Sequence, residues 1–289
     1  MKILLTGSDG QLGRQLQRAL PKLGALLCCN HRQCDLADAL ALRDTVRAFS
    51  PDVIVNAAAY TAVDRAEQEP EQAFAVNATA LAILGTEAER LGAMVVHYST
   101  DYVFGGDGER FQVETDPTAP RTVYGRSKLE GEHKLALATN RHLIFRTSWV
   151  LGPEGNNFAR TMLRLAAERD RLDVVDDQIG APTTTGLIAD VTLRALGHGA
   201  MVPGVYHLAA AGQTSWHAYA CHVIEAARTA GHRIRVLPQA IHPVSSRDYR
   251  THAHRPRNSR LDTGKLRRAL GVEFDDWRCG VDHVLQQIL

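Results

Sequence analysis

The chain has 289 residues, of which 45% are hydrophobic, and its 33 Lys and Arg residues nearly balance its 32 Asp and Glu residues. A formal net charge of +1 gives no electrostatic reason to expect a nucleic acid or an anionic membrane as partner. No apolar run reaches the ~18 residues that a membrane helix needs, and the length suits one large α/β domain or a main domain with a smaller one.

Cysteine and histidine usage favours a reducing compartment and gives no sign of a metal site. The five cysteines form no Cys-x-x-Cys pair and their number is odd, so free thiols are expected. Lys2 is followed at once by an apolar strand instead of a signal peptide, which favours a cytoplasmic protein. The 13 histidines show no metal-like pairing, and no metal site is predicted.

Strand-like and helix-like segments alternate along the chain. Strands are expected at 3–5, 25–29, 53–56, 94–98, 142–147, 172–175 and 205–209. Helices are expected at 14–20, 40–49, 71–91, 124–138, 157–168 and 185–196. This alternation predicts an α/β fold with a Rossmann-like, doubly wound parallel sheet that carries helices on both faces.

The chain is expected to divide near residue 150. Residues 1–150 form the predicted NAD(P)-binding domain, to which the strands near 172–175 and 205–209 return. Residues 151–289 mainly form a smaller lobe for the substrate, placed over the carboxyl ends of the strands, where open α/β sheets bind ligands. Within it, 242–260 is rich in Arg, Pro, Ser and His and predicts an extended loop, whereas 262–289 predicts helix.

A glycine-rich turn follows the first strand, with glycines at Gly7, Gly10 and Gly13. The turn leads into a helix whose unpaired N–H groups and dipole favour a phosphate. Glycine lets the backbone bend sharply and lets a pyrophosphate approach. The spacing is Gly-x-x-Gly-x-x-Gly and not the commoner Gly-x-Gly-x-x-Gly, so an ordinary glycine-rich βα turn remains the alternative.

The segment after the second strand bears on cofactor choice. Asp35, next to Leu36, could meet the adenine or ribose of a dinucleotide, or could cap a helix beginning near Ala37. Asn30 stands where an acid would bind a ribose 2′-hydroxyl, and Arg32 could accept a 2′-phosphate instead. The sequence therefore favours NADPH, with NADH possible.

Two further strand ends carry candidate site residues. Small residues at 56–59 would let the backbone lie against a cofactor, or would serve tight packing of helix on sheet. After the fourth strand, strand alternation lets only one of Ser99 and Thr100 face a substrate carbonyl oxygen, and Asp101 is either a site residue or a turn residue. Trp149 follows the fifth strand, as either a substrate contact or core.

Tyr124 and Lys128 are four residues apart in a predicted helix, on one face and one turn apart. A free tyrosine has a pKa near ~10, and a lysine cation beside it favours the phenolate and lowers that pKa. A phenol tuned in this way can give a proton to a ketone oxygen or take one from an alcohol.

With these motifs, the chain resembles the extended short-chain dehydrogenase/reductase family. The residues that carry the resemblance are 6–13, 56–59, 99–104, Tyr124 and Lys128. Further stretches at 145–150, 155–159, 177–183 and 255–261 resemble a branch of the family that reduces nucleotide sugars, and they span nearly the whole chain.

The resemblance implies reduction, by NADPH, of the C4 ketone of the dTDP-sugar dTDP-4-dehydro-6-deoxy-L-mannose. It implies that Tyr124 donates the proton, that Lys128 holds the nicotinamide ribose and that Thr100 bonds the reacting oxygen. The implied substrate contacts are Thr100, Asp101, Tyr102, Trp149 and Asn157. The implied cofactor contacts are Gly7, Gly10, Gln11, Leu12, Gly13, Asn30, Asp35, Leu36, Ala59, Tyr60, Thr61, Tyr98, Tyr124 and Lys128.

Some family members bind Mg²⁺ through acidic residues at a dimer interface. The matching positions here are Gln15, Gly186 and a glutamine near the C-terminus, which are poor ligands for a hard cation. A monomer or weak homodimer without that metal is therefore expected. Two alternatives remain, a nucleotide-sugar epimerase or dehydratase on the same scaffold and a non-catalytic regulatory subunit.

Overall fold

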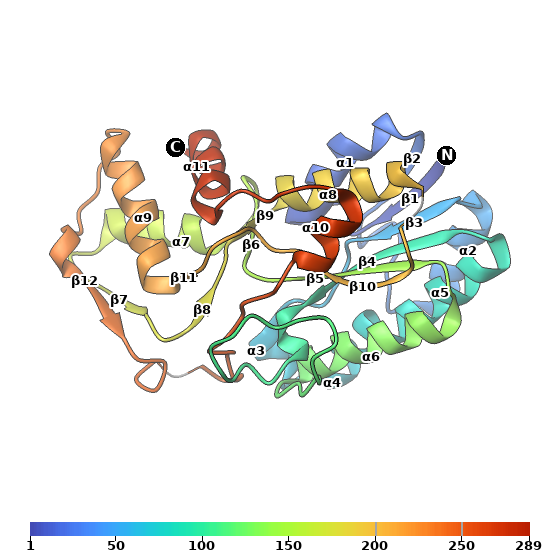
Figure 1. The fold of residues 1–289 in the computed structure, drawn as a ribbon, viewed down its shortest axis with the longest axis horizontal. Coiled ribbons are helices and arrows are strands. Elements are labelled where there is room, and N and C mark those ends of the chain that lie inside the picture. The colour runs from blue at the N-terminus through green and yellow to red at the C-terminus, as the bar shows by residue number, and fades with distance from the viewer. Residues whose placement is uncertain (200, 250) are drawn as a thin grey trace.

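The computed structural model describes residues 1–199, 201–249 and 251–289 and is built around a parallel sheet (Figure 1). Among these residues the central sheet has six strands in the order β10-β5-β4-β3-β1-β2, all parallel. The strands are β1 (Lys2–Thr6), β2 (Ala25–Cys29), β3 (Val53–Asn56), β4 (Met94–Thr100), β5 (His142–Thr147) and β10 (Gly204–His207). The predicted doubly wound α/β fold is confirmed.

Helices cover both faces of the central sheet (Figure 1). One face carries α2 (Ala39–Phe49), α5 (Ala80–Leu91) and α6 (Val123–Ala138), and the other carries α1 (Gln11–Ala19), α8 (Thr185–His198) and α10 (Gly264–Leu270). Successive residues of a strand point to opposite faces. Leu4 of β1 is accordingly buried in one core, while its neighbours Ile3 and Leu5 are buried in the other.

The second lobe is a separate layer of helices and short strands (Figure 1). It contains α7 (Phe158–Glu168), α9 (Trp216–Thr229) and α11 (Trp277–Ile288), which share a core of their own. Its short strand pairs are β6 (Val150–Leu151) with β9 (Thr183–Thr184), β7 (Leu172–Val175) with β12 (Ile241–Val244), and β8 (Ile179–Gly180) with β11 (Thr214–Ser215).

The strand expected near 205–209 joins the central sheet beside β5, but the strand at 172–175 does not return to it. That expectation is wrong because β7 pairs with β12, and Leu172 and Val174 are buried in the core of the second lobe. Neither β12 nor α9 was predicted. The expected loop at 242–260 begins with β12 and is otherwise irregular where described; Arg250 lies outside the described residues.

The single helix expected over 71–91 is interrupted. It consists of α4 (Pro70–Phe74), a π-helical segment (Ala75–Thr79) and α5, which ends at Gly92 in the left-handed conformation with φ 66°. Shorter elements are α3 (Val63–Ala66) and 3₁₀ turns at Leu20–Lys22, Asp101–Val103 and Pro238–Ala240. Within the described ranges, no helix has both the length and the apolar character needed to cross a membrane.

Candidate active site

A cavity of about 1260 Å³ lies at the carboxyl ends of the central strands and extends into the second lobe. Pockets for one small molecule usually measure about 300–1,000 Å³, so this cavity has room for a dinucleotide and a second ligand. Its lining combines the glycine-rich turn, the ends of β3 and β4, α6 and the aromatic residues of the second lobe.

The glycine-rich turn is shaped by close backbone approaches. Gly7 has φ +72°, and a Cβ there would lie 2.5 Å from the Ala58 backbone nitrogen. A Cβ on Gly13 would lie 2.0 Å from the Gly7 carbonyl oxygen, so Gly13 serves packing beneath the turn. Gly10 caps α1 in an extended conformation, and the first N–H groups of the helix are therefore available to an anion at the cavity.

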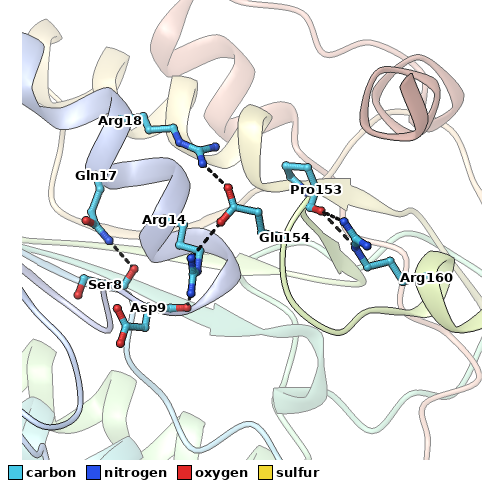
Figure 2. Close-up of polar contacts among 8 residues, drawn as sticks. All are labelled: Ser8, Asp9, Arg14, Gln17, Arg18, Pro153, Glu154 and Arg160. Carbon is cyan, nitrogen blue, oxygen red and sulfur yellow. Dashed lines mark hydrogen bonds and ion pairs between the residues drawn. The ribbon is translucent and has the colours of Figure 1, made fainter. Parts of the chain in front are cut away.

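A loop of the second lobe, 152–157, is fastened to α1 beside this turn (Figure 2). Glu154 accepts hydrogen bonds from Arg14 and Arg18 of α1. The Gln11 side chain, expected at the cofactor, bonds this loop as well, because the Gly152 N–H donates to its Oε1 at 3.1 Å. Arg14 donates to the Asp9 carbonyl oxygen at 3.0 Å, so one contact network supports both the turn and the loop.

Tyr124 and Lys128 lie in the first turns of α6. Thr122 caps the helix by accepting from the Gly125 N–H at 3.0 Å. Lys128 is 1% exposed; its Nζ donates to the Tyr98 carbonyl oxygen at 2.7 Å and lies 2.9 Å from His97 Nε2. The phenol of Tyr124 packs edge-on against Tyr102, with ring centroids 5.4 Å apart.

The expected lowering of the Tyr124 pKa by Lys128 is not found in this structure. Burial raises the pKa of Tyr124, against a weaker opposing effect of its hydrogen bond with Thr100. Burial also lowers the pKa of Lys128 to about 7, because a buried site disfavours the charged form of either group. Tyr124 is therefore a neutral phenol at neutral pH, which is the form that donates a proton.

Asp101 directly follows β4 and is contacted there by a residue of the second lobe. Ser259 donates to its carboxylate at 2.5 Å and Thr100 donates at 3.2 Å. Burial raises the pKa of Asp101 to about 6, and Asp101 both begins the turn after β4 and lines the cavity. The two residues before it bond different partners, because Ser99 donates to Glu132 at 2.5 Å while the Thr100 hydroxyl donates to Asp101.

The Trp149 side chain both lines the cavity and packs against another aromatic ring. Its ring stacks on Trp216 of α9 with centroids 3.6 Å apart and an interplanar angle of 14°, and both rings line the cavity. Its φ of +48° lies in the left-handed region, which is rare outside glycine. A costly backbone conformation held beside a ligand cavity is typical of functional sites.

The family model described as "RmlD substrate binding domain" matches residues 1–289. A dTDP-4-dehydrorhamnose reductase of Shigella flexneri is 48% identical over 100% of this chain and 98% of that protein. The chain belongs to the dTDP-4-dehydrorhamnose reductase family. A structure of the Clostridium acetobutylicum relative covers 99% of both chains with a TM-score of 0.91 at 33% identity. A Bacillus anthracis relative in complex with NADP has a TM-score of 0.90 at 33% identity, again over 99% of both chains.

Most residues that family resemblance placed at the site do line the cavity: Gly7, Gly10, Gln11, Leu12, Asp35, Leu36, Ala59, Tyr60, Thr61, Tyr98, Thr100, Asp101, Tyr102, Tyr124, Lys128 and Trp149. Of the described residues, Gly13, Asn30 and Asn157 are outside that lining. Asn30 instead accepts from the N–H groups of Arg32 and Gln33. Asn157 caps α7 and donates to the Gly152 carbonyl oxygen at 2.8 Å.

The alternative role of Asp35 as a helix cap is wrong. Helix α2 begins at Ala39 and is capped by Asp38, which accepts from two N–H groups. Asp35 accepts a local bond from the Ala37 N–H at 2.9 Å, lies 3.5 Å from His31 Nδ1 and lines the cavity. Asp35 therefore stays a predicted cofactor contact, and its place in the cavity lining is compatible with that role.

Several residues at the cavity were not predicted from the sequence. The buried hydroxyls of Thr147 and Ser148 have no partner among the described atoms and line the cavity at the end of β5. Arg255 pairs with Asp64 and donates to the Tyr102 hydroxyl at 3.2 Å, bringing the 251–261 segment over the site. The stretches 145–150 and 255–261, noted for their resemblance to the family, contain the two hydroxyls and Arg255, but nothing in the sequence indicates Trp216.

The described part of the chain holds no group of three or more His, Cys, Asp and Glu side chains that could bind a metal.

Proposed function

We propose that this chain reduces the C4 ketone of dTDP-4-dehydro-6-deoxy-L-mannose to dTDP-L-rhamnose with NADPH. One observation carries the proposal, namely that Tyr124, Lys128 and Thr100 meet in a cavity with room for two ligands. The relatives named dTDP-4-dehydrorhamnose reductase supply the substrate class, and they match the chain over its full length.

The site fits a dinucleotide. The backbone around Gly7 leaves no room for a Cβ. The N-terminus of α1 is open to a pyrophosphate at Gly10, Gln11 and Leu12. Asp35 and Leu36 would hold the adenosine half, and Lys128 the nicotinamide ribose. When bound, the cofactor supplies the hydride. The unpartnered hydroxyls of Thr147 and Ser148 would give its nicotinamide end hydrogen-bonding partners.

The chain itself supplies the proton. Tyr124 would donate its phenolic proton to the oxygen at C4 as that oxygen gains negative charge. Thr100, which lines the same cavity as Tyr124, would bond the same oxygen and orient it. A positioned acid of this kind typically contributes about 10²–10⁴-fold to the rate. Because the phenol is buried, water is kept from competing for the proton.

The second lobe would bind the sugar nucleotide. Asp101 and Tyr102 lie beside Tyr124 and would contact the sugar, and the stacked Trp149–Trp216 pair offers a flat apolar surface next to them. Asn157 would act indirectly, by holding the 152–157 loop. We propose the domain division accordingly, with residues 1–150 and β10 binding the cofactor and most of 151–289 binding the substrate.

The finer properties are also proposals. NADPH is favoured over NADH because a relative was obtained with NADP and because Arg32 follows β2, where a 2′-phosphate would be met. Five free thiols favour the cytoplasm. A monomer or weak homodimer without Mg²⁺ is expected, since Gln15 and Gly186 lack carboxylates.

The test is NADPH oxidation followed by absorbance, with the ketone made in place from dTDP-glucose by the two preceding enzymes. The proposal expects oxidation that depends on the sugar and is faster with NADPH than with NADH. The control is the Tyr124→Phe variant, which should bind NADPH and fail to turn over. No oxidation by a protein that still binds NADPH would instead favour a regulatory role or another sugar.

A further inference from the structure

His97 is a buried titratable group in contact with the site for which the mechanism above has no use. It lies on β4, is 0% exposed, and its two ring nitrogens face Asn56 of β3 and Lys128 of α6. Asn56 Nδ2 is 3.1 Å from His97 Nδ1, and His97 Nε2 is 2.9 Å from Lys128 Nζ. These three side chains form one hydrogen-bonded row from the sheet to the cavity.

The direction of each bond in the row can be derived from one backbone group. The Ala58 N–H can only donate, and it donates to Asn56 Oδ1 at 3.2 Å; Thr6 donates to the same oxygen at 2.6 Å. This fixes the orientation of the Asn56 amide, so its NH₂ group faces His97. Because an NH₂ group only donates, His97 Nδ1 must carry a lone pair, and the ring proton of a neutral His97 sits on Nε2.

We propose that His97 is a positioning residue that holds Lys128 as a neutral amine, through a hydrogen bond from His97 Nε2–H to Lys128 Nζ. An ammonium group has donors only and would meet the Nε2–H donor to donor at 2.9 Å. A neutral amine accepts that bond with its lone pair and still donates to the Tyr98 carbonyl oxygen at 2.7 Å.

The surrounding charges are compatible with this assignment. Burial lowers the pKa of His97 well below its usual value, the Asn56 backbone opposes this more weakly, and a cationic Lys128 would lower that pKa further. Burial likewise lowers the pKa of Lys128, against an opposing effect of Glu132. Glu132 is itself paired with Arg146. The buried titratable or charged side chains on the elements packed around Lys128 include His97 and Tyr98 of β4, Asp101 of the turn after β4, Glu132 of α6, and His142 and Arg146 of β5. Tyr102 and Tyr124 line the cavity together with Lys128.

A lysine that is neutral at rest can accept a proton from a buffer acid, whose conjugate base stays in the solvent, when a phenolate forms on Tyr124. Its positive charge would then appear only at the step that it stabilises. This consequence rests on the proposed function, whereas the tautomer and the charge state concern the protein alone and are measured without substrate.

The test is NMR of the cofactor-free protein. In protein labelled with ¹⁵N-histidine, the His97 signals are identified by their loss in His97→Gln. The expected result is a neutral ring protonated at Nε2 throughout the neutral range. A ring protonated at Nδ1, or an imidazolium, would overturn the proposal. The chain has five lysines, so a ¹³Cε-lysine titration resolves Lys128, which is expected to lose its proton near neutrality.

A near-isosteric variant tests the causal link. Asn56→Asp replaces the NH₂ donor by an acceptor, so the His97 proton should move to Nδ1 and Nε2 should turn its lone pair towards Lys128. The Lys128 titration should then shift to higher pH. The matched control is Asn77→Asp, because Asn77 is also 1% exposed but bonds Tyr60 and Ser127. It should leave the His97 tautomer unchanged; an unchanged tautomer in Asn56→Asp would refute the assignment.

Discussion

Glu132 of α6 forms a buried ion pair with Arg146 of β5, which joins the helix to the central sheet. The substitution Glu132→Gln should therefore destabilise the protein strongly. Arg146 donates to the Glu132 carboxylate at 2.9 Å and 2.6 Å, and Ser99 of β4 donates at 2.5 Å. The side chains of Glu132 and Arg146 are 3% and 6% exposed. Removing one partner leaves the other charge buried without compensation, which typically costs about 3–5 kcal/mol, a large share of a total stability of about 5–15 kcal/mol.

The assay is urea unfolding followed by circular dichroism. The matched control is Glu154→Gln, because Glu154 also bonds two arginines but its side chain is 32% exposed and theirs are 51% and 59% (Figure 2). Exposed pairs contribute about 0–1 kcal/mol, so this variant should change little. The double variant Glu132→Leu with Arg146→Met should recover much of the loss. If Glu132→Gln cost no more than Glu154→Gln, the reasoning from burial would be refuted.

Three further predictions concern the cavity. Tyr124→Phe should lower kcat by about 10²–10⁴-fold while NADPH affinity, measured by fluorescence titration, stays nearly unchanged; a near-normal kcat would mean that another group is the acid. Lys128→Ala should lower both kcat and NADPH affinity, and unaltered affinity would remove the ribose contact. Asp101, whose pKa is raised from 3.8 to about 6, favours folding when protonated. Wild-type stability relative to Asp101→Asn should therefore fall as the pH rises from 3.8 to about 6, by about 3 kcal/mol, and a constant difference in urea unfolding would contradict the raised pKa.

The sequence predicts the central sheet well because its signals are local. Largely apolar runs such as 53–56 are typical of strands covered on both faces, and Gly92 ends α5 as a left-handed residue should. The segment 172–175 was also predicted as a strand, but its sequence alone does not say which strand it pairs with. Its pairing with β12 depends on contacts about seventy residues apart along the chain, which local sequence does not encode.

The sequence predicted which residues form the site better than it predicted their pKa values. Tyr124 and Lys128 were identified from their spacing and Thr100 from its place at the end of the fourth strand, and all three line one cavity. The expected low pKa of Tyr124 depended on a charged Lys128 in a solvated setting. Burial of both groups reverses that expectation, and burial is set by the whole fold. Trp216 was missed for a similar reason, since only the docking of α9 brings it against Trp149.

The most direct test of the account is to follow the hydride. NADPH deuterated at C4, prepared in each configuration, would be given to the enzyme with dTDP-4-dehydro-6-deoxy-L-mannose, and the product examined by NMR and mass spectrometry. The account predicts that one configuration delivers deuterium to C4 of dTDP-L-rhamnose and that Tyr124→Phe forms little of this product. A product without deuterium from either configuration, or with deuterium at another carbon, would contradict it.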